Sequence, residues 1–168
     1  MLILIFLLLF SGALEAQQIR RWSSTTGDVS LSAASLAATI QQPATNGSDT
    51  TIDQVIVYCS VACTVTQSAN GAAATTTAGT INPISPTPTN APVPVNFFTS
   101  SNVGSGTAQG GAVHIPAATT FIFCLSKACG VGGDVVVGRG GGTSSNYSFT
   151  VQSITGTANI TFLFRTLQ

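Results

Sequence analysis

Beyond its first sixteen residues, this chain consists of short runs of β-branched and aromatic residues, each closed by Gly, Pro, Asn or Ser. No window beyond that leader repeats apolar residues at the 3.6-residue spacing of an amphipathic helix. Strands that recur about every 8–12 residues, with turn residues between them, are typical of two-sheet all-β folds. We therefore expect a single antiparallel β-sandwich or jelly-roll-like domain that follows an N-terminal signal peptide.

Two hairpins are expected within this domain. Asn70-Gly71, a strong signal for a two-residue hairpin turn, lies between strands expected at residues 63–67 and 72–80. The strands expected at residues 147–151 and 160–164 alternate large apolar residues with smaller ones. This C-terminal pair predicts a hairpin with one buried aromatic face.

Other segments have a less regular pattern. The Ala-rich residues 31–40 predict at most two helical turns, and the Pro-rich residues 82–94 predict an extended surface connection. The remaining strands are expected at residues 51–58, 95–98, 112–116, 119–125 and 134–137.

The first residues have the pattern of an export signal. Residues 2–10 are all apolar, about half the length that a bilayer-spanning helix needs. Cleavage is expected after Ala16, with Ala13 as the alternative. The leader lacks Lys and Arg, and Arg20-Arg21 follow it, which leaves a membrane anchor or a misassigned start as alternatives. We expect residues 1–16 to be a signal peptide and the protein to be secreted or displayed at the cell surface.

The mature chain divides into a polar N-terminal arm at residues 17–35 and a sandwich domain at residues 36–168. The arm has so little pattern that an extended first strand and a mobile lead-in are both compatible with it. Charge is scarce, with 5 Lys+Arg and 5 Asp+Glu in 168 residues. Apart from Arg20-Arg21 there is no basic cluster, so nucleic acid is not an expected partner, and no membrane association is expected once the signal is removed.

Four cysteines lie in two close pairs, Cys59 with Cys63 and Cys124 with Cys129. Export favours disulfides over a zinc site, because zinc-binding pairs usually have tighter spacing and further ligands nearby. Three pairings are open, and the Ser and Ala between the members of each pair slightly favour two local bridges. A local bridge requires a turn, because a fully extended four-residue step spans about 13 Å.

Few residues in this chain are of the types that carry out catalysis. His114 is the only histidine, and a Ser or Thr nucleophile activated by it would need Asp134 or Asp53 to orient its ring. No Gly-x-Ser-x-Gly motif is present, so the pattern favours a histidine with a structural place on a strand. We expect no enzyme activity and no catalytic residues.

Signals for bound ions are also weak. Asp49, Asp53 and Asn46 offer oxygen atoms for Ca²⁺, but their spacing does not match a known calcium loop, and turn or strand-end roles are favoured. The glycines on either side of Arg139 lack the pattern of a phosphate-binding loop. We expect no metal and no cofactor.

A ligand surface is the remaining possibility for a site. Sugar-binding sandwiches present exposed aromatic rings, and here Trp22 and Tyr58 are candidates, with Arg139 as a candidate polar contact. The composition resembles that of non-catalytic extracellular β-sandwiches such as adhesion domains. We expect a secreted structural or interaction protein that works by adhesion or assembly, with itself or an extracellular surface as partner. The alternative is an extracellular carbohydrate-binding module with a glycan as partner.

Overall fold

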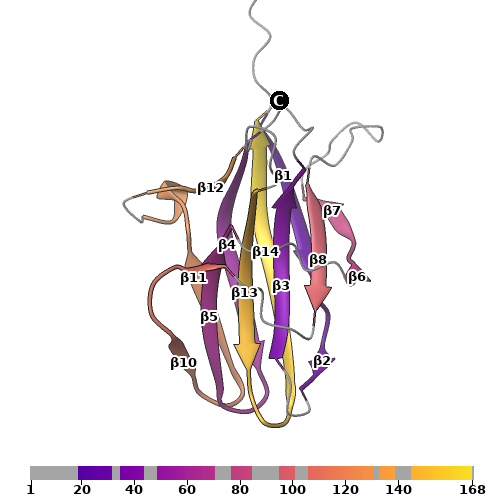
Figure 1. Cartoon of the computed structure of the whole chain (residues 1–168), viewed down its shortest axis with the longest axis vertical. Helices are drawn as coiled ribbons and strands as arrows, with labels where there is room; N and C mark the ends of the chain where they lie inside the picture. Colours follow the sequence, from indigo (N-terminus) through magenta and orange to yellow (C-terminus); the bar gives the residue numbers. More distant parts are fainter. Residues whose placement is uncertain are drawn as a thin grey trace, which may run out of the picture.

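The computed structural model describes residues 19–31, 35–43, 49–70, 77–84, 95–100, 106–130, 133–138 and 145–167. In these ranges two antiparallel sheets pack face to face, as Figure 1 shows, which confirms the expected all-β sandwich. The expected signal peptide at residues 1–16 lies outside the described residues.

The strands of sheet A are β1 (Ile19–Thr25), β2 (Val29–Ser30), β4 (Thr50–Cys59), β7 (Ile81–Pro83), β11 (Thr119–Cys124), β12 (Val135–Val137) and β14 (Thr157–Leu167). Their order across the sheet is β11-β4-β14-β1-β7, with β12 also paired to β4 and β2 paired to β14. Both β11 and β12 therefore lie along the same side of β4.

The strands of sheet B are β3 (Ser35–Gln42), β5 (Cys63–Ala69), β6 (Thr77–Ala78), β8 (Asn96–Ser100), β9 (Thr107–Ala108), β10 (Val113–Ile115) and β13 (Ser145–Gln152). Their order is β10-β5-β13-β3-β8-β6, with β9 also paired to β5. The long strands β13 and β3 thus lie in the middle of this sheet.

The N-terminal segment is part of the sandwich. Of the two alternatives for the N-terminal arm, the extended strand is the one observed at residues 19–25, where β1 lies between β14 and β7. The described strand β1 therefore belongs to sheet A of the sandwich. Residues 31–40 allowed at most two helical turns, and none forms in their described part from residue 35 on, where β3 is a strand and pairs with β13 and β8. Burial on a sheet outweighs the helical propensity of its alanines.

The expected C-terminal hairpin is also wrong. β13 and β14 are both strands, but β13 pairs with β3 and β5 in sheet B, whereas β14 pairs with β4, β1 and β2 in sheet A. The turn at residues 153–156 therefore joins the two sheets. The aromatic faces meet across the core, with the rings of Phe149 and Phe162 5.7 Å apart.

The hairpin expected around Asn70-Gly71 is not formed in the described residues. Asn70 has the positive φ of a turn residue, 55°, and its amide donates to the carbonyl oxygen of Asn146. The described part of the expected return strand, Thr77–Ala78, pairs with β8 and not with β5. β5 instead pairs with β13, β10 and β9.

Each cysteine pair forms a local disulfide, Cys59–Cys63 and Cys124–Cys129. Cys59 ends β4 in sheet A and Cys63 begins β5 in sheet B, with Cα atoms 6.3 Å apart. This bridge therefore closes the corner where the chain passes from one sheet to the other, and both of its cysteines are buried.

Hydroxyl and amide pairs take the place of ion pairs inside the sheets. Thr39 and Ser148, opposite each other in β3 and β13, are both buried, and their hydroxyl oxygens lie 2.7 Å apart. Thr50 donates to the side-chain oxygen of the fully buried Gln42 at 3.0 Å. These contacts satisfy buried polar groups without the desolvation cost of a charge.

Candidate functional site

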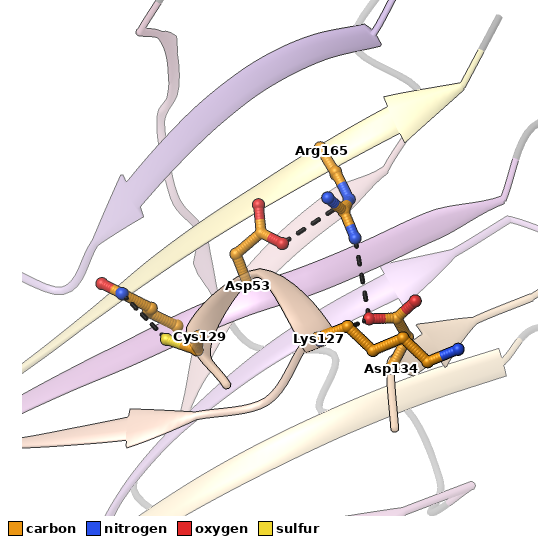
Figure 2. Close-up of polar contacts among 6 residues, drawn as sticks. Asp53, Lys127, Cys129, Asp134 and Arg165 are labelled. Atoms are coloured by element: carbon orange, nitrogen blue, oxygen red, sulfur yellow. Dashed lines mark hydrogen bonds and ion pairs between the residues drawn. The ribbon is translucent and has the colours of Figure 1, made fainter. Parts of the chain in front are cut away.

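Charged side chains gather on the outer face of sheet A around Arg165. Its Nε atom lies 3.5 Å from Oδ1 of Asp53, and its Nη2 atom lies 3.6 Å from Oδ1 of Asp134 (Figure 2). The three side chains are between 20% and 30% exposed. We call these three residues the Arg165 cluster.

A β-bulge places Asp53 in this cluster. Gln54 pairs with Leu163 and Ile52 pairs with Phe164, so Asp53 is an extra residue in β4 without a partner in β14. Its carbonyl oxygen accepts a hydrogen bond from the amide of Leu125 at 3.0 Å. Because an extra residue turns the local backbone, the carboxylate of Asp53 points toward Arg165.

The segment between β11 and β12 leaves the sheet edge at the same level. It carries the Cys124–Cys129 disulfide and a short 3-10 helix, η1 (Lys127–Cys129). The backbone amide of Lys127 donates to Oδ1 of Asp134 at 2.8 Å, and Gln54 donates to the sulfur of Cys129. The Arg165 cluster thus ties this segment to the strands beneath it.

A cavity of about 270 Å³ adjoins the cluster and is lined in part by Arg21, Asp53, Gln54 and Leu163. Arg21 lies opposite Arg165 in the β1–β14 register. Both carboxylates already face a guanidinium, so the arrangement works as an ion-pair network. Among the described residues, no group of three His, Cys, Asp or Glu side chains is placed to hold a metal ion.

The structure separates the residues expected to form a ligand surface. Trp22 points into the core, where it is 3% exposed and its indole N–H donates to the hydroxyl of Thr166 at 3.1 Å. Tyr58 is half-buried on the opposite, outer face of the same sheet. Arg139 lies outside the described residues. Trp22 therefore cannot act as an exposed stacking platform, because the core covers its ring.

His114 lies apart from the acids considered as its partners. It is exposed on β10, and its Nδ1 atom is 3.1 Å from the hydroxyl oxygen of Thr64 on β5. Asp53 and Asp134 face Arg165 on the other sheet. An open cavity of about 640 Å³ adjoins His114, and Thr64, Gln152 and Ile154 also line it.

A surface that the sequence reading missed runs along β11 and β12. Phe121, Ile122 and Val136 are 39%, 51% and 49% exposed, three of the large apolar side chains that are exposed in the described part of the chain. Residues 119–125 were expected to form an ordinary apolar strand. The signal was the consecutive Phe121-Ile122-Phe123, which places large apolar groups on both faces of one strand.

No protein-family model matches this chain, and comparisons with curated proteins and with solved structures give no significant match. Within the described ranges, no helix has the length and hydropathy needed to cross a bilayer.

Proposed function

We propose that this protein is an exported, non-catalytic β-sandwich that acts through its surface as a structural or interaction protein and assembles with itself. The observation that carries this proposal is the exposed apolar strip along β11 and β12. It lies in a chain that has no Lys, Arg, Asp or Glu between Asp53 and Lys127. An uncharged surface can be buried against another molecule at little desolvation cost.

Export is supported by two features. The apolar run at residues 2–10 and the small residues before Gln17 have the pattern of a cleaved signal. The two disulfides are compatible with an oxidising, extracellular compartment.

The proposal that the protein is non-catalytic is supported by the contacts of the side chains that could act as catalytic acids or bases. Asp53 and Asp134 share Arg165, and the imidazole of His114 lies beside the hydroxyl of Thr64 with no carboxylate contact among the described residues. A general base that acts on a nucleophile needs an orienting partner, and these positions do not supply one.

The test is light scattering and negative-stain microscopy on the oxidised chain that begins at Gln17, across a concentration series. Oligomers or filaments whose fraction rises with concentration are the expected result. A monomer throughout the series would overturn the assembly part of the proposal.

The open cavity beside His114 supports a second candidate function, binding of an extracellular carbohydrate. Its lining combines hydroxyl, amide and imidazole groups from Thr64, Gln152 and His114 with the apolar Ile154, as sugar recognition requires. Retention on an insoluble polysaccharide that is lost in Gln152→Ala but kept in Gln109→Ala, an exposed glutamine outside this lining, would support it. Equal retention of both variants, or no retention of the wild type on any polysaccharide, would count against it.

A further inference from the structure

The strands that end the two sheet orders, β6, β7, β10 and β11, differ in how well their free edges are protected. β6 has two residues, β7 has three and ends at Pro83, and β10 has three and is followed by Pro116. Short edge strands and prolines are the usual protection of a sheet edge against pairing with another chain. β11 has six residues, with neither proline nor charge.

The hydrogen-bond alternation shows which backbone groups of β11 face outward. The amide of Leu125 donates to the carbonyl oxygen of Asp53. Because hydrogen-bonded residues alternate along an antiparallel strand, the odd-numbered residues of β11 are the ones that bond to β4. The other side of β4 is consistent with this alternation. The amide of Ser60 donates to the carbonyl oxygen of Thr157, so the even-numbered residues of β4 bond to β14 and its odd-numbered residues bond to β11. The N–H and C=O groups of Thr120 and Ile122 therefore point away from β4, and no described strand lies on that side.

Apolar side chains flank these outward groups on both faces of the sheet. Phe121 points to the core side, where its ring packs 4.8 Å from that of Phe123, yet it stays 39% exposed. Ile122 points to the outer face beside Ile56 and is 51% exposed. A strand added along β11 would cover both.

We propose that β11 is the self-association surface, and that it pairs antiparallel with β11 of a second copy of this chain about a two-fold axis. This inference rests on the proposed function and identifies the strand through which two copies would assemble. A two-fold axis perpendicular to the sheet relates two edge strands in antiparallel orientation and keeps the core sides of both sheets on the same face. The partner is an identical chain because an uncharged edge brings no like charges together when two copies meet.

The placement of the nearby charges agrees with this orientation. Lys127 and Asp134 lie beyond the Cys124 end of β11, whereas no charged residue lies near its Thr119 end in sequence. Antiparallel pairing therefore places the Lys127 and Asp134 of the two copies at opposite ends of the shared edge. Parallel pairing would instead place the two Lys127 residues at the same end.

The test compares three variants by sedimentation velocity across a concentration series. Ile122→Pro removes an outward N–H that has no role in the β4 ladder, and Ile122→Lys places a charge on the edge. Each should raise the dimer dissociation constant about tenfold or more, because the two-fold axis places the substitution in the interface twice and so doubles the loss of binding free energy. Ile154→Lys is the matched control, since Ile154 is 81% exposed in the turn at the end of the sandwich. It should associate like the wild type.

Folding is checked separately from association. Ile122→Pro should keep the wild-type far-UV spectrum and the melting temperature of the monomer. Phe121→Pro, which removes a donor to β4, should lower that melting temperature. If the wild type associates and both Ile122 variants associate equally well, the β11 contact is overturned while self-assembly stands. If the wild type is monomeric throughout, self-assembly itself is overturned, and the open edge would be assigned to a strand from another protein.

Discussion

The ring of Phe149 in β13 meets the ring of Phe162 in β14 edge to face, with centroids 5.7 Å apart and planes at 85°. Both side chains are fully buried, and they belong to different sheets. Because this contact joins the two layers, Phe149→Ala should lower the free energy of unfolding by about 3–5 kcal/mol. Urea denaturation of the oxidised protein measures this loss.

Phe121→Ala is the control for that variant. Phe121 is already 39% exposed, so its side chain buries less apolar surface than that of Phe149 and its removal should cost less stability. Both variants are compared at a concentration low enough that association does not contribute. Equal losses would contradict the central position of Phe149 between the sheets.

The alternation at residues 147–151 and 160–164 was enough to predict two strands and their buried faces. It could not predict their partners, because a hairpin in one sheet and an arch between two sheets bury the same alternating residues. The same limit applies to Asn70-Gly71, where the turn residue was correct and the pairing was not. Strand identity is local, whereas strand pairing depends on the whole chain.

Trp22 and the Arg165 cluster were missed for different reasons. Trp22 alternates on β1 with polar neighbours, so no apolar pattern marked it as a core residue. Arg165 meets Asp53 only because an extra residue in β4 turns the carboxylate toward it, and a bulge has no sequence signature here. The disulfides were easier to predict, since a turn between two nearby cysteines is a local property.

Gly156→Ala should be strongly destabilising at the turn between β13 and β14. Gly156 has a φ of 94°, and a Cβ atom there would lie 2.6 Å from Cγ2 of Val61 and 2.8 Å from Oγ of Ser60. Backbone strain and the clash together should reduce the free energy of unfolding by about 2–4 kcal/mol. Thermal and urea denaturation measure the loss.

Gly110→Ala separates these two causes. Gly110 also has a positive φ, 74°, but no atom lies within 4 Å of its added Cβ. Only the strain remains, so a loss of about 1 kcal/mol is expected. If the two alanine variants lose the same free energy of unfolding, the close packing of Gly156 against Val61 does not contribute to stability.

Arg165→Met tests whether the Arg165 cluster stabilises the fold through its charges. The substitution keeps most of the side-chain volume but leaves Asp53 and Asp134 without their shared positive partner. Because these groups are partly exposed, we expect a loss of about 1–2 kcal/mol in low salt and a smaller one in high salt. Urea denaturation in low and high NaCl measures both.

The combined variant Asp53→Asn/Asp134→Asn/Arg165→Met provides the control. Removing both carboxylates removes the uncompensated charges, so this variant should recover most of the stability that Arg165→Met loses. Failure to recover would mean that the arginine contributes by packing alone.

Tyr147 should make the fold sensitive to alkaline pH. Burial raises the pKa of its phenol above the ordinary value of about 10, while its hydroxyl donates to the side-chain oxygen of Gln67 at 2.8 Å. Since the folded state favours the protonated form, this stabilisation is fully present below the ordinary pKa and is lost as pH rises through the folded value. The melting temperature should therefore be flat below about pH 9 and fall above about pH 10. Tyr147→Phe should flatten this fall, whereas Tyr58→Phe, which removes the other tyrosine, should leave it in place. An unchanged fall in Tyr147→Phe would show that another group controls the alkaline transition.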